Sequence, residues 1–106
     1  MRRALCGLLV CLSVACGPVE YMSQVTRRAS SAVEAARAAN AETLAPYEFT
    51  SAVQYLHKAR EEASAAQFQP ALKFGRKAEE MAERARQRAI ERAREPDARL
   101  GGSAPP

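Results

Sequence analysis

Residues 69–94 read QPALKFGRKAEEMAERARQRAIERAR, and this segment carries a regular helical pattern. Small residues recur in it every three or four positions, which places them on one face of an α-helix. They are Ala71, Gly75, Ala78, Ala82, Ala85 and Ala89. Side chains this small let two helix axes approach to about 8 Å, the short end of the usual range. The pattern therefore predicts a helix over about 69–94 that packs closely against other helices.

Two further segments, at about 19–41 and 46–64, show the same periodicity. In the first, the apolar face is formed by Val25, Ala29, Ala32, Val33, Ala36 and Ala39. In the second, it is formed by Phe49, Ala52, Leu56, Ala59 and Ala63. Pro46 suits the first position of a helix, where its missing N–H costs nothing, and Glu48 adds a negative charge to the first turn.

The connections between these segments are short, so consecutive helices are expected to lie antiparallel. Residues 64–67 form the weakest helical stretch and the expected turn between the second and third helices. The predicted fold class is all-α: an antiparallel helical hairpin, extended by the first helix to a small three-helix bundle. Gly17-Pro18 is expected to break the chain before the first helix, and 95–106 to form a disordered tail. Long apolar side chains are expected to seal the edges of the Ala-lined seams, namely Phe49, Leu56, Phe68, Phe74 and Met81.

The N-terminus has the pattern of an export signal. Arg2 and Arg3 make a positive start, and residues 4–14 form an apolar stretch that is far shorter than the roughly 20 residues of a membrane-spanning helix. Small Ala15 precedes Cys16, which is similar to the lipobox of bacterial lipoproteins, although Ser13 holds a position that is usually aliphatic. This similarity implies a lipoprotein signal peptide over 1–15, lipidation of Cys16, and a lipid-anchored helical domain over 16–94.

Two other interpretations of the cysteines remain open. One is an ordinary secretory signal that is cut nearby and leaves a free thiol. The other treats Cys6, Cys11 and Cys16, evenly spaced by five, as metal ligands, but no other ligand types lie among them. Cleavage before Cys16 would leave one cysteine and therefore no disulfide framework. No metal and no cofactor is predicted.

The charge balance of the exported chain is only weakly basic. The sequence has 16 basic and 12 acidic residues, and loss of Arg2 and Arg3 with the signal leaves fourteen basic residues and a net charge of +2. An exported chain does not meet nucleic acid, so the expected partners are the membrane, through the acyl chains, and an envelope protein or peptidoglycan. Gly17 follows the cysteine where some lipoproteins retained at the inner membrane have aspartate. The expected location is the outer membrane, facing the periplasm, with inner-membrane retention left open.

Five residues form the predicted partner surface: Tyr47, Tyr55, Arg84, Arg88 and Arg92. The two tyrosines are eight positions apart and share one helix face, where they either pack at the core edge or form an exposed aromatic strip. The arginines belong to an alternating charge pattern in which Glu80 and Arg84 form a favourable i, i+4 pair. That pattern describes either a solvated face or an electrostatic landing patch.

Residues 46–78 look like one tetratricopeptide-type unit, which implies tetratricopeptide-like second and third helices. The spacing Phe68-x2-Ala71-x3-Gly75-x2-Ala78 matches that repeat, but Gly75 stands where a large aromatic residue is usual and Tyr55 stands at the tryptophan position. A single unit cannot stack into the usual binding groove. The resemblance therefore concerns fold and not peptide binding.

A broader resemblance is to a family of bacterial envelope lipoproteins known as a domain of unknown function (DUF 4398). Its motifs here are the Ala45-Pro46-Tyr47-Glu48 opening, the Tyr55-Leu56-x2-Ala59-Arg60 run, and the stretch from Phe68-x2-Ala71 to Lys77-Ala78-Glu79. The resemblance covers about residues 20–94. It implies an envelope location and a helical shape but supplies no established activity.

No set of residues supports catalysis. His57 is the single histidine, no serine–histidine–aspartate set or glycine-rich phosphate loop accompanies it, and Glu61 and Glu62 are adjacent and so point in different directions. The sequence therefore predicts a noncatalytic envelope lipoprotein that acts as a small helical protein-interaction or structural module. The alternative is a peptidoglycan- or anionic-lipid-binding module.

Overall fold

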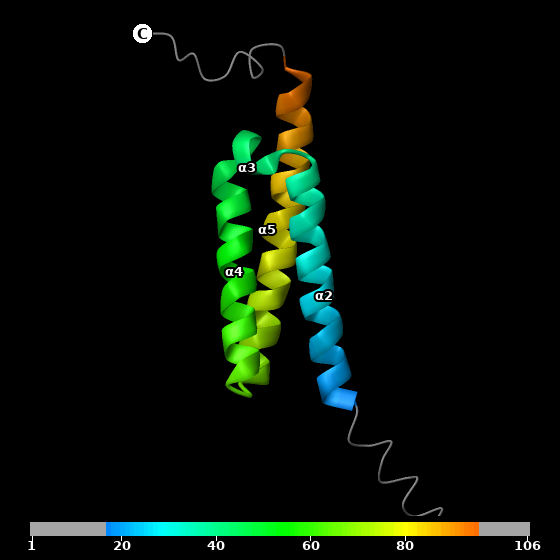
Figure 1. Ribbon diagram of the computed structural model, residues 1–106, viewed down its shortest axis with the longest axis vertical. Coiled ribbons are helices and arrows are strands. Elements are labelled where there is room, and N and C mark those ends of the chain that lie inside the picture. Colours follow the sequence, from blue (N-terminus) through cyan, green and yellow to red (C-terminus); the bar gives the residue numbers. More distant parts are fainter. Residues whose placement is uncertain (1–16, 96–106) are drawn as a thin grey trace, which may run out of the picture.

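The computed structural model describes the backbone of residues 17–95 and the side chains of residues 21–95. Three long helices, α2 (Gly17–Ala38), α4 (Pro46–Ser64) and α5 (Phe68–Arg94), run up, down and up, and the short α3 (Ala41–Leu44) turns the corner between the first two (Figure 1). The described part contains no strand. The prediction of an all-α fold, built as a helical hairpin that a first helix extends to a bundle, is confirmed.

The core of the bundle consists mainly of alanine. All six small residues of the predicted α5 seam are buried. The predicted faces of α2 and α4 are buried as well, except that their last members, Ala39 and Ala63, are half-buried. Because most core side chains are a single methyl group, the bundle buries little apolar area per residue and depends on close contact between its helices.

Gly75 lies where α5 packs closely against α2. A Cβ atom built on Gly75 would lie 2.7 Å from Cγ1 of Val25 and 4.0 Å from Cβ of Ala59. Since real Cβ contacts are not this short, the valine side chain occupies the space that a side chain at position 75 would need. Gly75 therefore permits the contact between α2 and α5.

The larger apolar side chains fill the edges of this seam, with one exception. Phe49, Leu56 and Met81 are buried, and Phe74 is half-buried. Phe68 was expected to seal an edge, but it is 42% exposed. It is the first residue of α5, at the end of the bundle, where no further helical turn covers it.

The first helix has different limits from those predicted. It ends at Ala38 and not at 41, because Asn40 adopts the left-handed conformation (φ 62°) and stops the helix. The following residues form α3 where only a connection was expected. At the other end, α2 already begins at Gly17, so the predicted break at Gly17-Pro18 is wrong: a proline in the first helical turn removes no intrahelical hydrogen bond.

The turn between α4 and α5 lies where it was predicted. The amide of Ala66 donates to the Ala63 carbonyl (3.0 Å) and that of Gln67 to the Glu62 carbonyl (2.8 Å), the pair of bonds that defines a Schellman motif. Ala66 sits at its left-handed position with φ 58°. The predicted limits of α4 are confirmed, and α5 begins one residue earlier than predicted. The predicted signal peptide over 1–15, the lipidation site at Cys16, and residues 96–106 of the predicted tail lie outside the described residues.

Candidate interaction surface

The tyrosines predicted on one helix and the arginines predicted on the next meet on one surface. Tyr47 lines a shallow hollow between α4 and α5 together with Arg84 and Arg88. A second shallow depression along α4 is lined by both Tyr47 and Tyr55. We call the surface formed by Tyr47, Tyr55, Arg84 and Arg88 the α4/α5 face. It joins four of the five residues of the predicted partner surface.

The two tyrosines take different positions on this face. Tyr55 is half-buried, and its ring stacks on Phe74 of α5 with centroids 6.2 Å apart and planes 22° apart. It therefore packs at the core edge, one of the two predicted roles. The side chain of Tyr47, near the start of α4, is 75% exposed, so the face carries one exposed tyrosine and not the predicted strip of two. An exposed ring of this size offers a large contact area at a small cost in side-chain entropy.

Arg88 binds a buried carboxylate within the chain. Its Nη1 donates to Oε1 of Glu48 at 2.6 Å, and the Glu48 side chain is only 10% exposed whereas that of Arg88 is 53% exposed. The guanidinium thus satisfies a carboxylate that would otherwise lie buried without a counter-charge. The role of Glu48 predicted from the sequence was a favourable charge in the first turn of α4, and the structure adds this long-range pair.

The other two arginines also have partners within the chain. Arg84 pairs with Glu80 at 2.7 Å, so the predicted i, i+4 pair is confirmed. Arg92 donates a hydrogen bond to the backbone carbonyl of Leu44, at the end of α3. Arg84 keeps a side chain that is 62% exposed and lies on the rim of the face. Arg92 does not line either hollow of the α4/α5 face, and its contact with α3 gives it a structural role at the corner.

The histidine and the carboxylates that follow it lie on the outer side of α4. His57 is exposed on α4 and lies 3.8 Å from Glu61, its one charged neighbour among the described ion pairs. Lys58 reaches Glu61 at 3.6 Å and Glu62 at 3.3 Å, so these carboxylates belong to a surface ion-pair cluster. Within residues 17–95 no three histidine, cysteine or acidic residues are grouped as a metal site would require. None of the described helices is long and apolar enough to cross a membrane.

Sequence reasoning missed two features. The first is the burial of Glu48, whose partner lies 40 positions away and is brought to it by the folding of the hairpin. The second is a groove between α2 and the far end of α4, lined among others by Arg27 and Arg60. No local pattern marks either feature, because both depend on which helix faces pack together.

Comparison with known protein families, characterised proteins and solved structures gives no match to this chain. The resemblances to the tetratricopeptide unit and to the envelope lipoprotein family therefore remain predictions.

Proposed function

We propose that this chain is a noncatalytic envelope lipoprotein whose helical bundle is a protein-interaction module, with the α4/α5 face as its contact surface. The observation that carries the proposal is the exposure of Tyr47 beside Arg84 and Arg88. Tyrosine and arginine are enriched among the residues that dominate binding energy at protein interfaces. A rigid helix supports each of them, so little ordering is needed when a partner binds.

The lipobox-like sequence before Cys16 supports the envelope part of the proposal. Lipid on that cysteine would hold the bundle at a membrane surface, on the outer membrane facing the periplasm. The open position of His57, which is exposed beside a surface cluster of ion pairs, supports a binding role over a catalytic one. Mass spectrometry of the mature N-terminus tests the anchor: a diacylated or triacylated cysteine is expected, and an unmodified N-terminus contradicts it.

A photo-crosslinking amino acid at Tyr47 tests the contact surface. The full chain is expressed in a bacterium, irradiated in intact cells, and recovered from detergent-solubilised envelopes. We expect a discrete crosslinked species at position 47 that is missing from a matched variant with the same group at Ser31, an exposed position on α2. Equal crosslinking from both positions, or none from position 47, would reject the α4/α5 face as the contact surface.

A substitution at the same position tests the energetics of the contact. Tyr47→Ala should reduce recovery of the crosslinking partner about tenfold or more, the range of an interface hot spot. It should change the free energy of unfolding by less than about 0.5 kcal/mol, because the side chain is exposed. Loss of binding together with loss of helical structure would indicate a folding defect, and the proposal would then lack this support.

The alternative function is a peptidoglycan- or anionic-lipid-binding module that uses Arg84, Arg88 and Arg92. Each of these arginines contacts a group within the chain, which weakens this alternative for the C-terminal cluster. The variant Arg84→Gln tests this alternative. If these arginines bind peptidoglycan or anionic lipid, less of the variant should sediment with peptidoglycan or anionic vesicles.

A further inference from the structure

The two ends of the bundle carry opposite net charge. The end where α2 begins and α4 turns into α5 comprises residues 17–30 and 57–77, with seven basic and three acidic residues (Figure 1). The other end comprises residues 31–56 and 78–95, with six basic and eight acidic residues. The first end, which we call the basic end, therefore has an excess of four positive charges. A negatively charged surface would attract this end and repel the other.

Several cations at the basic end are not neutralised by a described carboxylate. Arg76 donates to the hydroxyl of Tyr21 at 2.6 Å, and Arg60 donates to the hydroxyl of Ser30 at 3.4 Å. Both partners are uncharged, so each guanidinium keeps its full charge and further N–H donors for an outside group. The three arginines of the opposite end that were predicted to bind a partner contact carboxylates or a backbone carbonyl instead.

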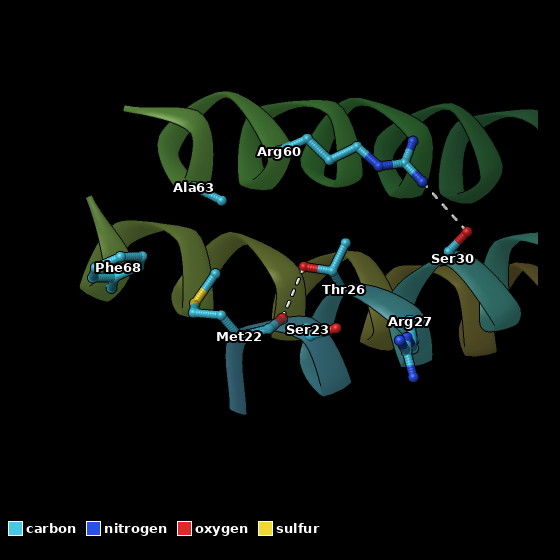
Figure 2. A pocket seen from close by; sticks show the side chains of 8 residues that line it. All are labelled: Met22, Ser23, Thr26, Arg27, Ser30, Arg60, Ala63 and Phe68. Carbon is cyan, nitrogen blue, oxygen red and sulfur yellow. Dashed lines mark hydrogen bonds between the residues drawn. The ribbon is translucent and has the colours of Figure 1, made fainter. Parts of the chain in front are cut away.

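A groove of about 430 Å³ opens at this end, between α2 and the last turns of α4. Figure 2 shows Arg60 reaching from α4 toward Ser30 of α2, with Met22 and Phe68 farther along the groove. Its lining thus combines two arginines, Arg27 and Arg60, with apolar side chains. This combination matches a phospholipid, which has an anionic phosphate next to an apolar region.

Two of the three exposed aromatic side chains among the described residues lie at the same end. Phe68 is 42% exposed and Tyr21 is 47% exposed, although contact between an apolar ring and water is unfavourable. Tyrosine is enriched at the boundary between lipid and water, and phenylalanine is common on the apolar face of helices that lie at this boundary. Exposure of Phe68, which the sequence did not predict, is therefore expected for a surface that rests on head groups.

The described part of α2 starts at this end too, and the proposed anchor is the residue before it in the sequence. Helix α2 begins at Gly17, immediately after Cys16, so no flexible linker separates a lipid on that cysteine from the bundle. Met22 and Ser30, at the two ends of the groove along α2, lie roughly 8 and 20 Å along the helix from Gly17 at about 1.5 Å per residue. An acylated Cys16 would hold the basic end close to the membrane.

We infer that the basic end is a docking surface for anionic phospholipid head groups, and that the groove lined by Arg27 and Arg60 receives a lipid phosphate. This inference rests on the proposed anchor, and it adds a defined orientation. The bundle stands with the basic end on the bilayer and with α3 and the Tyr47 end of the α4/α5 face farthest from it. Tyr47, near α3, is then presented to a partner.

The test uses the full lipidated chain, reconstituted into vesicles of phosphatidylcholine alone or of phosphatidylcholine and phosphatidylglycerol in equal parts. Amide hydrogen exchange is measured for residues 57–68 at the basic end and for residues 38–46 at the opposite end. We expect exchange at the basic end to slow severalfold on the anionic vesicles only. Exchange at the opposite end should not differ between the two vesicle types.

Charge variants show whether the groove is responsible. Arg27→Gln with Arg60→Gln should remove the protection, since each basic residue near an anionic surface contributes about fivefold to binding. Arg27→Lys with Arg60→Lys should retain it. Arg86→Gln with Arg94→Gln is the matched control, because it removes the same charge from the opposite end and should change nothing. A melting curve by circular dichroism confirms that each variant is folded.

The outcomes separate this inference from the proposed anchor. If Cys16 is acylated but exchange is the same on both vesicle types, the docking surface is wrong and the anchor stands. If Cys16 is unmodified, the anchor is wrong, and sedimentation of the chain with the two vesicle types decides the docking surface. Salt-sensitive binding to the anionic vesicles that depends on Arg27 and Arg60 would support it, and no binding would overturn it.

Discussion

Glu48 and Arg88 are joined by a 2.6 Å hydrogen bond between Oε1 and Nη1, which ties the first turn of α4 to the C-terminal half of α5. The carboxylate is almost fully buried and the guanidinium is half-exposed. Such a pair adds little net stability compared with apolar residues, but loss of one partner leaves the other without compensation. The pair therefore constrains which α5 position lies beside the start of α4.

Arg88→Gln should lower the free energy of unfolding by about 1–2 kcal/mol, because Glu48 would lose its counter-charge while it remains buried. This magnitude is below that of a fully buried pair, since solvent screens the exposed arginine. Urea denaturation followed by circular dichroism measures the change. Arg86→Gln is the control, because Arg86 has only a 4.0 Å contact with Glu83 and both side chains are about half-exposed. An equal loss of unfolding free energy in the two variants would show that the buried pair contributes no more to stability than the exposed one.

Ala66→Gly should stabilise the protein by about 1 kcal/mol. Ala66 holds the left-handed position of the turn after α4, where an L-residue with a Cβ atom is strained and glycine is not. The greater freedom of glycine in the unfolded chain reduces the gain without cancelling it.

Thermal denaturation of the two full-length proteins measures this gain. Ala65→Gly is a matched control one position earlier, because Ala65 has φ −87° and so has no left-handed strain to relieve. It should give no increase in melting temperature. An increase of similar size at both positions would argue against a conformational cause.

The parts of the fold that follow from local spacing could be predicted from the sequence. The alanine seam of α5 is recognised by its alternating intervals of four and three. Pro46 indicates the start of α4, because a proline is tolerated in the first turn of a helix and not in its interior. The end of α2 could not be placed by periodicity, because alanines continue past the point where Asn40 turns left-handed. Asparagine adopts the left-handed conformation more readily than most residues do, so Asn40 is itself the sequence signal for the end of α2.

The candidate site was predictable in its members and not in its contacts. Eight-residue spacing placed Tyr47 and Tyr55 on one side of a helix without any tertiary information. The proximity of Tyr47 to Arg84 and Arg88 depends on how the hairpin aligns its two helices, and a shift by one turn would pair other residues. The contacts of Arg88 with Glu48 and of Arg92 with Leu44 depend on the same alignment of the helices.

The Lys58 ammonium should titrate at a pH above its ordinary pKa of 10.5, because the side-chain hydrogen bond with Glu62, then the charges of Glu61 and Glu62, stabilise the protonated form. A pKa raised by folding means that the contribution to stability is complete below the ordinary pKa and is lost as the pH rises through the folded value. The side chain is about half-exposed, so the effect on stability is small.

Nuclear magnetic resonance of the lysine side chain measures this pKa directly. Glu62→Gln should lower the pKa of Lys58 more than Glu61→Gln does, because the hydrogen bond with Glu62 is the largest cause of the raised pKa, whereas Glu61 acts mainly through its charge. The reverse order would show that Glu61 is the principal partner.

The effect of Gly75→Ala on the free energy of unfolding should change sign with the residue at position 25. Alanine is favoured over glycine within a helix by about 1 kcal/mol, so propensity alone predicts a gain. In the native chain, however, the new Cβ atom would lie 2.7 Å from Cγ1 of Val25, and overpacking of this kind costs about 1–3 kcal/mol. The substitution should therefore destabilise the bundle by about 1 kcal/mol.

Val25→Ala removes the atom that meets the new methyl group. In that background Gly75→Ala should stabilise the bundle by about 0.5–1 kcal/mol, because the helix-propensity gain remains and the added methyl group fills part of the space that the valine left. A double-mutant cycle from urea denaturation should then give a coupling energy of about 1.5–2 kcal/mol between the two positions. The same sign of effect in both backgrounds would mean that α2 and α5 can separate at this point, and that close contact at Gly75 does not determine how the first helix packs on the hairpin.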